Sequence, residues 1–326
     1  MVLESALIDR ISTVLERRSN DVMRWLGDDA AVTKQSHFAV TSIDAFVENV
    51  HFSRTNSTWK QIGHRALAGA LSDIAAMGVA TADAYIALGL PNDVSERDVL
   101  DLYEGIEALA SSTGSTVCGG DLTSSAVTFV TICVTGCTSD EAELVGRNGA
   151  RPGDLVAVTG NLGGAAAGRA LVEGRASTDA RVSLERFRHP LPRLREGRAL
   201  ASAGVSAMID ISDGVATDAS HIAQMSGSNL RIDLERLPLD DGVTAVAESL
   251  GTDPYKFAAT GGEDYELLVC VPECRRAQAE SAVEEVGITW IGTVESAKPS
   301  ESPGLHLFRS NLEVTGLQGY EHFGAI

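Results

Sequence analysis

Hydrophobic positions along the chain follow two periodicities, one typical of helices and one typical of strands. Helical spacing predicts helices over residues 4–18, 58–77, 95–112, 164–173, 192–203, 215–227, 240–250 and 273–286. Short apolar runs predict strands over 38–44, 84–90, 116–118, 127–135, 155–159, 207–211, 230–234, 267–271, 288–294 and 305–308. This mixture of elements indicates an α/β or α+β architecture.

Length and turn chemistry predict two domains. The 326 residues exceed the usual size of one domain. Residues 138–153 resemble a connector and end in Arg151-Pro152-Gly153-Asp154, which is typical of a turn. We therefore expect an N-terminal domain over 1–137 and a C-terminal domain over 138–326.

Composition excludes several classes of protein. The formal net charge of −19 argues against nucleic acid as a partner, because a phosphate backbone requires a basic surface. No apolar run approaches the roughly 20 residues that span a membrane, and the N-terminus lacks signal-peptide features. The five cysteines form no CxxC pair, which favours buried thiols over a zinc site. We expect a soluble, cytoplasmic protein without a membrane or nucleic-acid partner.

Acidic residues recur beside glycines and at the predicted ends of strands. In the stretch 208–214, Asp210 and Asp213 stand three residues apart between a predicted strand and a predicted helix. Paired carboxylates suit a divalent cation, and a helix start favours an anion. The alternative is that Ser212 or Asp213 is only a helix N-cap. The other acids with such positions are Asp28, Asp29, Asp44, Asp73 and Asp121.

Several such acids together predict two or more magnesium ions around a polyphosphate, which is an arrangement for phosphoryl transfer. Arg147, in the connector, is either a phosphate contact or a surface arginine. Two common nucleotide motifs do not fit. The glycine-rich stretch 160–164 lacks the GxGxxG spacing, and none of the four lysines follows a glycine as a Walker A lysine would.

The ordered motifs resemble those of the thiamine-monophosphate kinase family and cover nearly the whole chain. They are Gly27-Asp28-Asp29-Ala30-Ala31-Val32, Asp44 with Glu48 and His51-Phe52, Leu71-Ser72-Asp73-Ile74-Ala75-Ala76-Met77-Gly78, Gly119-Gly120-Asp121, Ile209-Asp210-Ile211-Ser212-Asp213-Gly214, Gly261-Gly262-Glu263-Asp264-Tyr265-Glu266-Leu267 and Gly319-Tyr320-Glu321-His322-Phe323.

The resemblance implies a fold and a reaction. The fold is the two-domain architecture of the aminoimidazole-ribonucleotide synthetase superfamily, with α/β and α+β domains. Its N-terminal sheet pairs with a copy in a homodimer, and its C-terminal domain completes the active-site cleft. The reaction is ATP-dependent phosphorylation of thiamine monophosphate to thiamine diphosphate by direct in-line transfer, without a covalent nucleophile. Magnesium ions are the implied cofactor, and a potassium requirement is left open.

The resemblance also implies roles for individual residues. Implied magnesium ligands are Asp29, Ser42, Asp44, Asp73, Asp121, Asp210 and Asp213. Implied ATP contacts are Gly120, Arg147 and Ser212. Implied contacts to thiamine monophosphate are His51 and Glu263, together with a tail aromatic, either Tyr320 or Phe323. An aromatic ring beside a cationic thiazolium is physically favourable.

The chain departs from the family pattern at a few positions. Ile43 replaces a hydroxyl residue, Ala70 replaces an asparagine, Asn49 precedes Val50-His51 where a glycine is usual, and a tryptophan is missing near Leu317. These changes motivate an alternative, a catalytically weakened paralogue that binds nucleotide or thiamine phosphate as a sensor. Another kinase or synthetase of the superfamily is a second alternative. Two members of that superfamily are disfavoured. A hydrogenase-maturation relative would end in a reactive cysteine and a selenophosphate synthetase would carry one near its N-terminus, and this chain has neither.

Overall fold

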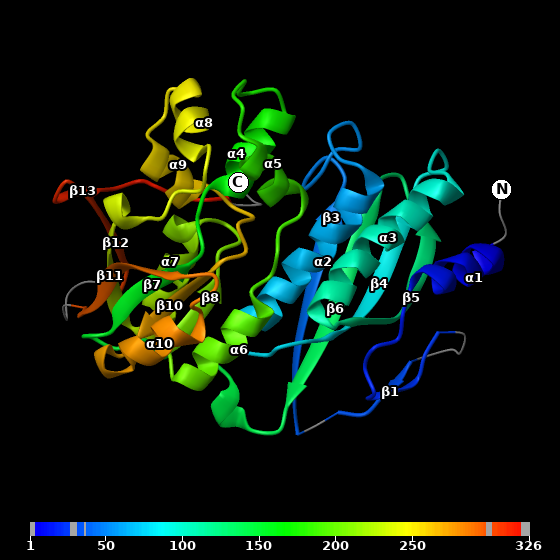
Figure 1. Ribbon diagram of the computed structural model, residues 1–326, viewed down its shortest axis with the longest axis horizontal. Helices are drawn as coiled ribbons and strands as arrows, with labels where there is room; N and C mark the ends of the chain where they lie inside the picture. The colour runs from blue at the N-terminus through cyan, green and yellow to red at the C-terminus, as the bar shows by residue number, and fades with distance from the viewer. Residues whose placement is uncertain (1–3, 27–30, 36, 298–301, 321–326) are drawn as a thin grey trace. The chain divides into compact units, whose positions relative to one another are not determined.

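The chain forms two compact units, which are described separately. The computed structural model describes residues 4–26, 31–35, 37–297 and 302–320, so Asp29 and Phe323 lie outside the described residues. Unit 1 comprises Met1–Ile74 and Val79–Glu141, and unit 2 comprises Ala75–Gly78 and Ala142–Ile326. Figure 1 labels their helices and strands.

Unit 1 carries the N-terminal elements. They are α1 (Glu4–Val14), β1 (Val22–Arg24), β2 (Val32–Thr33), β3 (Phe38–Val47), α2 (Trp59–Ala76), β4 (Asp83–Leu90), α3 (Glu96–Thr113), β5 (Thr116–Ser124) and β6 (Phe129–Thr138). A short 3-10 helix, η1 (Glu141–Glu143), begins at the last residue of unit 1 and continues into unit 2.

The main sheet of unit 1 has the strand order β3-β6-β4-β5. The β4–β5 pair is parallel, and the β3–β6 and β4–β6 pairs are antiparallel. Side chains alternate between the two faces of such a sheet. One face is buried, with Ile86 and Ile132 at 0% exposure, and α2 and α3 lie along the sheet in Figure 1. The other face is open, and Ile43 on it is 67% exposed.

Unit 2 carries the remaining elements. They are β7 (Leu155–Thr159), α4 (Gly164–Val172), α5 (Arg181–Arg188), α6 (Leu194–Ala203), β8 (Ala207–Asp210), α7 (Val215–Ser226), β9 (Ser228–Asp233), η2 (Leu234–Arg236), α8 (Val243–Ser249), α9 (Pro254–Thr260), β10 (Leu267–Val271), η3 (Glu273–Arg275), α10 (Arg276–Ala282), β11 (Ile288–Ser296), β12 (Leu305–Arg309) and β13 (Leu312–Val314).

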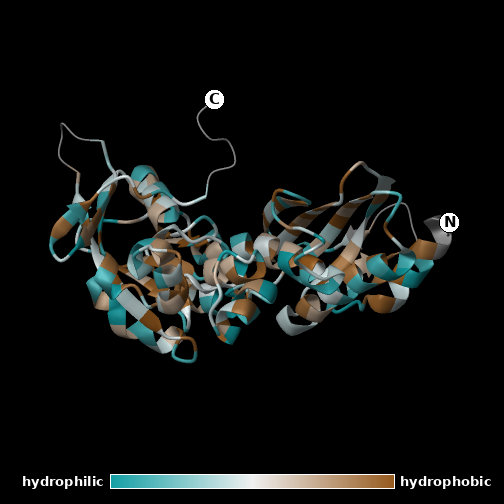
Figure 2. Ribbon diagram, turned by 90° about the horizontal axis from the view of Figure 1, so that it is seen from above, coloured by the Kyte–Doolittle hydropathy of each residue, from teal (hydrophilic) through white to brown (hydrophobic). Residues whose placement is uncertain are grey.

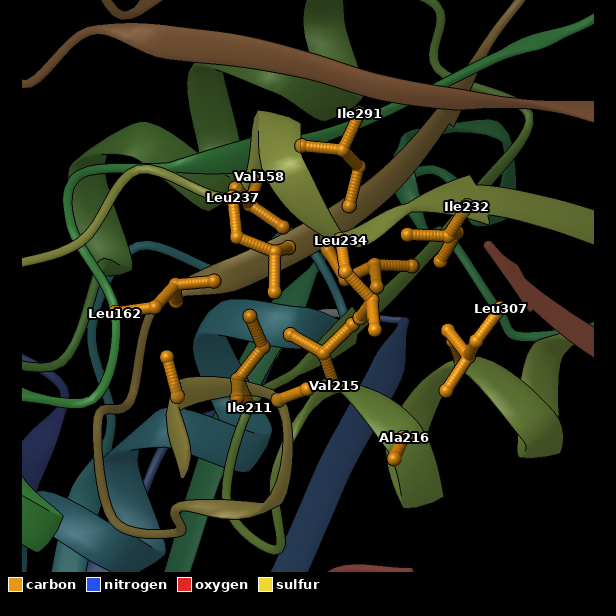
Figure 3. Packing of buried hydrophobic residues seen from close by; sticks show 14 of the residues in the cluster. Val158, Leu162, Ile211, Val215, Ala216, Ile232, Leu234, Leu237, Ile291 and Leu307 are labelled. Carbon is orange, nitrogen blue, oxygen red and sulfur yellow. The ribbon is translucent and has the colours of Figure 1, made fainter. Parts of the chain in front are cut away.

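The sheet of unit 2 has seven strands in the order β13-β12-β9-β11-β7-β10-β8. Among its pairs, β12–β9 is parallel and the others are antiparallel. Its hydrophobic core includes Ile211 and Val215, which Figure 3 shows pointing into the cluster with Leu162 and Leu234. Burial of these side chains fixes the junction between β8 and α7. Figure 2 shows the amphipathic helices, with brown and teal residues alternating along them.

The structure confirms the mixed two-domain fold and corrects several predicted elements. Strand β5 continues from Thr116 through Ser124, so residues 119–121 form no turn. Asp44 lies within β3 rather than at a strand end. Helices α5 and α9 and strands β1 and β13 were not predicted. Within the described part of the chain, no helix has the length and apolar character needed to cross a membrane.

Candidate functional site

The turn between β8 and α7, residues 211–214, is the centre of the candidate site in unit 2. Asp210 ends a fully buried strand and is 3% exposed, and Ile211 after it is completely buried. Gly214 has φ +106°, a backbone conformation that favours glycine, and it occupies the N-cap position of α7. Neither Ser212 nor Asp213 is therefore the N-cap residue, and the capping alternative is wrong for both.

The side-chain carboxylate of Asp218 stabilises this turn. Its Oδ2 accepts hydrogen bonds from the backbone N–H groups of Asp213, at 3.1 Å, and Gly214, at 3.0 Å. Its side chain is inside the protein, and the residue is 2% exposed. Burial, together with the nearby carboxylates of Asp210 and Asp213, raises the pKa of Asp218 to about 8. Three carboxyl groups thus share a small region where a cation would relieve their repulsion.

The segment 263–266 pairs with the same turn through its backbone. The N–H of Glu263 donates to the carbonyl of Ser212 at 2.8 Å, and the N–H of Tyr265 donates to that of Ile211 at 2.9 Å. Both Glu263 (φ +69°) and Tyr265 (φ +50°) adopt the left-handed conformation. Such backbone strain in side-chain-bearing residues clusters at functional sites. The predicted contacts Ser212 and Glu263 are therefore direct neighbours.

The C-terminal segment also meets this turn. The N–H of Tyr320 donates to the carbonyl of Asp213 at 3.1 Å, and that of Gly319 donates to Thr217 Oγ1 at 2.9 Å. A Cβ at Gly319 would lie 1.9 Å from the Asp213 carbonyl oxygen, so the close approach requires glycine. Asp210, Ser212, Asp213, Glu263 and Tyr320, predicted from separate motifs, are thus gathered in one place.

A pocket of about 570 Å³ opens beside these residues. Asp213, Thr217, His221, Leu317 and Tyr320 contribute to its lining. Its volume lies within the range of small-molecule sites, and its lining combines apolar side chains with the carboxylates of Asp213 and Glu313 and with hydroxyl groups. This chemistry suits an organic ring system that carries a few polar groups.

The glycine-rich turn before α4 is filled by the protein itself. Asp264 accepts hydrogen bonds from the N–H groups of Gly163, at 2.6 Å, and Ala165, at 3.1 Å. Burial raises the pKa of Asp264 to about 7, while the two N–H donors act in the opposite direction. Because a carboxylate occupies the position of a bound phosphate, this turn is not a nucleotide cradle. The rejection of a dinucleotide site is consistent with this geometry.

A buried ionic network holds the end of the segment 263–266, just before β10. Glu266 is completely buried and accepts hydrogen bonds from Arg193 Nε (2.7 Å) and Nη2 (2.5 Å) and from Thr159 Oγ1 (2.7 Å). Arg186 joins Glu266 to Asp240 through contacts of 3.3 and 2.9 Å. A carboxylate held by this many donors fixes the start of β10 firmly.

In unit 1, Ser42, Asp44 and Asp73 are brought together. Ser42 and Asp44 lie on the same face of β3 because they are two residues apart. Ser42 Oγ donates to Asp73 Oδ2, on α2, at 2.5 Å. Burial, and then the nearby Asp73 carboxylate, raises the pKa of Asp44 to about 6. The three side chains offer only oxygen donors, which are the ligands that magnesium prefers.

Asp121 is not part of this group within one chain. It pairs with Ala87 on β4, which pairs with Thr131 and in turn with Ala45 on β3. This register places Asp121 on the open face of the sheet and on the strand at the opposite edge from Asp44. Ile43 lies on the open face too. The replaced hydroxyl there would not have shared a face with Ser42 and Asp44.

The other predicted contacts are spread over both units. Gly120 lies in β5, where a Cβ would be 2.0 Å from the Ile86 carbonyl oxygen. Arg147 is half-buried, and its carbonyl accepts a hydrogen bond from Ser226 Oγ at 2.8 Å, at the end of α7 farthest from Asp213. His51 is half-buried in the turn after β3.

No group of three or more His, Cys, Asp or Glu side chains is placed to hold a metal ion by itself, as far as residues 4–26, 31–35, 37–297 and 302–320 show. Each unit instead offers carboxylates in smaller sets. Magnesium accepts such sets, because it keeps water molecules or phosphate oxygens in its remaining positions. The donor chemistry therefore fits magnesium bound together with a polyphosphate.

Sequence reasoning missed the residues that organise the site. Asp218 and Arg193 were not selected at all, and Asp264 and Glu266 were noted only as motif letters. Asp264 and Glu266 contact backbone N–H groups or an arginine far away in the sequence. Asp218 instead accepts from the N–H groups of Asp213 and Gly214, which lie shortly before it in the chain. No local pattern marks Asp264 and Glu266, because Tyr265 between them adopts the left-handed conformation and the alternation of a strand does not apply there.

Comparisons with known proteins identify the family of the chain. The family described as AIR synthase related protein matches the chain twice, its N-terminal domain at residues 27–138 and its C-terminal domain at residues 151–302. The thiamine-monophosphate kinase of Salmonella typhimurium is 33% identical over 98% of both chains.

Solved structures give the same result. The crystal structure of thiamine-monophosphate kinase from Stenotrophomonas maltophilia K279a has a TM-score of 0.80 and 30% identity, over 94% of this chain and 96% of that one. A structure of AaThiL complexed with AMPPCP and TMP has a TM-score of 0.77 and 29% identity, over 99% of each chain.

Proposed function

The chain belongs to the thiamine-monophosphate kinase family, and from this premise we infer that it transfers the γ-phosphoryl group of ATP to thiamine monophosphate. The products are ADP and thiamine diphosphate. The observation that carries this proposal is the convergence of Asp210, Ser212, Asp213, Glu263 and Tyr320 around one turn, beside a pocket of suitable size.

Carboxylates of both units serve the reaction as magnesium ligands. We propose Asp210 and Asp213 in unit 2, and Ser42, Asp44 and Asp73 in unit 1. Asp29 and Asp121 complete the proposed set. Magnesium supplies charge neutralisation for the phosphates when it is bound. Burial, and after it the neighbouring carboxylates, raise the pKa values of Asp44 and Asp218, so acidic groups are crowded within both proposed ligand sets.

The remaining predicted residues bind and orient the two substrates. Proposed ATP contacts are Gly120, Arg147 and Ser212. Proposed contacts to thiamine monophosphate are His51, Glu263, Tyr320 and Phe323. Tyr320, which lines the pocket, would hold the cationic thiazolium ring against its face. The substrate's own phosphate oxygen attacks the γ-phosphorus, so the protein needs to position it rather than supply a covalent nucleophile.

The protein works as a homodimer in this proposal. The open sheet face of unit 1 presents Ile43, Cys133, Tyr85 and Thr131 to solvent or leaves them half-buried. An uncovered sheet face with apolar side chains is typical of a surface that another protein covers. Asp121 lies on this same face, so pairing through it would bring Asp121 into the interface. We also propose a cytoplasmic location, where ATP is available as donor.

An ADP-release assay tests the reaction. Purified protein is mixed with ATP, with or without thiamine monophosphate and with or without magnesium. ADP formation that needs both additions is the expected result. Tight binding of thiamine monophosphate without ADP formation would favour the sensor, and turnover with a different acceptor alone would reject the substrate assignment.

A further inference from the structure

Arg169, on α4, stands next to the segment that carries Glu263. Helix α4 packs closely on this segment, since a Cβ at Gly261 would lie 2.8 Å from the Cβ of Ala166. Ala166 and Arg169 are three residues apart, so they lie on the same face of α4. The next turn of the helix therefore brings the side chain of Arg169 to the side of Glu263.

The electrostatics of Arg169 agree with this placement. Burial acts to lower the pKa of Arg169, and the hydrogen bond with Glu173 acts to raise it. The charge of Glu263, and after it that of the Tyr320 hydroxyl, adds to the increase, so the pKa lies above its ordinary value. Glu263 and Tyr320 are proposed contacts to thiamine monophosphate from two separate segments. Arg169 joins them from a third, and no motif of the sequence pointed to it.

Two ion pairs orient the guanidinium of Arg169. Its Nε donates to Glu173 Oε1 at 2.8 Å, and Arg175 Nε donates to Glu173 Oε2 at 2.7 Å. The backbone N–H of Glu173 also donates to the Arg169 carbonyl at 2.9 Å, so both side chains start from the end of α4. Because the bond to Glu173 uses Nε, the Nη groups are left as donors towards the site. The Arg169 side chain is 38% exposed, so a ligand can reach it.

The aminopyrimidine ring of thiamine monophosphate presents an edge that matches these groups. Its exocyclic amino group is a hydrogen-bond donor, and the ring nitrogen beside it is an acceptor. A carboxylate next to a guanidinium is complementary to this pair, because an ionised carboxylate only accepts and an arginine only donates. Glu173 and Glu263 also offset the charge of Arg169, which would otherwise repel the cationic thiazolium ring.

We propose that Arg169 is a specificity-determining residue, which donates from its Nη groups to the ring nitrogen beside the amino group of thiamine monophosphate. This rests on the proposed function, in which Glu263 is a contact to the same substrate and would accept from the amino group. Together the two side chains read the order of donor and acceptor along the pyrimidine edge. An analogue with the reverse order sets donor against donor and acceptor against acceptor, which lowers its affinity.

Oxythiamine monophosphate is the analogue that tests this proposal. It carries a carbonyl in place of the amino group and a hydrogen on the neighbouring ring nitrogen. The preference for thiamine monophosphate over this analogue is measured as a ratio of kcat/KM values, and as a ratio of Kd values by calorimetry without ATP. Arg169→Met removes the donor that opposes the N–H of the analogue, so it should lower the preference about 10-fold and leave the KM for ATP unchanged. Arg169→Lys retains a donor and should keep most of the preference.

Arg181→Met, at an 89% exposed side chain of α5, is the matched control and should leave the preference unchanged. A wild type without the preference, or equal losses for both compounds in Arg169→Met, would overturn the proposal, because a structural or purely electrostatic role affects both compounds alike. If Arg169→Met does not fold, Arg169→Ala gives the same test. Wild-type protein that binds thiamine monophosphate but forms no ADP would instead reject the kinase reaction, while the ratio of Kd values would still decide the role of Arg169.

Discussion

At the scale of single residues, the substitution Asp213→Asn tests whether this carboxylate is a metal ligand or only stabilises the fold. Gly214 occupies the N-cap position of α7, so the fold does not use Asp213 for capping. We expect Asp213→Asn to lower turnover about 100-fold or more, because it removes a ligand charge worth several kcal/mol at the phosphates. The free energy of unfolding should change by less than about 1 kcal/mol. Steady-state kinetics and chemical denaturation measure the two effects.

The control for Asp213 is Asp233→Asn. Asp233 caps η2 by accepting a hydrogen bond from the N–H of Glu235 at 3.1 Å. Because asparagine caps nearly as well as aspartate, this variant should keep full activity. Unchanged activity in Asp213→Asn as well would remove Asp213 from the metal site.

The raised pKa of Asp264 predicts how the free energy of unfolding changes with pH. Its pKa of about 7 lies above the value of 3.8 expected in the unfolded chain, so the folded protein binds the proton more tightly. The stability from this group is fully present below about pH 4 and is lost as the pH rises through about 7. Asp264→Asn does not titrate, although it gives up one of two backbone hydrogen bonds at a constant cost of about 1 kcal/mol.

The measurement is the free energy of unfolding of both proteins at several pH values without metal. The difference between variant and wild type should move in favour of the variant, by up to a few kcal/mol, between pH 4 and 7. Asp179→Asn, a change at an exposed carboxylate, controls for the loss of surface charge. A difference that stays constant with pH would show that Asp264 is ionised throughout this range.

At the scale of elements, periodicity was most informative where a strand is buried on both faces. The bounds of β7 and β10 follow directly from their apolar runs. Where pairing partners extend an element, the sequence was insufficient. β5 continues to Ser124 because β4 pairs with it along its whole length, which local turn residues do not reveal. Likewise, the sequence motifs indicated acids and glycines of the candidate site. They did not indicate the carboxylates and backbone groups that form hydrogen bonds with them.

The junction of β8 and α7 makes a testable prediction at this scale. A Cβ at Gly214 would lie 2.9 Å from the Thr260 carbonyl carbon and 3.0 Å from the carbonyl oxygens of Ala259 and Gly261, at φ +106°. Gly214→Ala should therefore destabilise the protein by about 3 kcal/mol or more and reduce turnover, since it displaces the turn that carries Asp213.

Gly227→Ala is the matched control at the other end of α7. Gly227 has φ +64°, but nothing lies within 4 Å of its Cβ position. This variant should cost only the roughly 1–2 kcal/mol of the left-handed conformation and leave turnover unchanged. Similar losses of stability and activity in both variants would mean that the contacts around Gly214 have no special role. Thermal unfolding and the ADP-release assay decide between these outcomes.

At the scale of the whole molecule, the open face of the unit 1 sheet requires a partner in the proposed dimer. The alternation along β3 separates two functions on one strand. Ser42 and Asp44 lie on the face that bears the carboxylate group with Asp73, whereas Ile43 lies on the open face. In the proposed dimer, the departure at Ile43 would therefore bear on association, because its side chain does not share a face with Ser42 and Asp44. This placement removes one of the reasons to expect a weakened enzyme.

Ile43→Glu tests the dimer. The side chain is 67% exposed in the single chain, so a glutamate there costs little folding free energy. In a dimer that buries this face, the same carboxylate would be desolvated without a partner, which costs several kcal/mol. We expect the wild type to sediment as a dimer at micromolar concentration and Ile43→Glu to sediment as a monomer. Leu312→Glu, at a 73% exposed leucine in unit 2, should remain dimeric. A monomeric wild type, or an Ile43→Glu variant that still dimerises, would show that this face is not the interface.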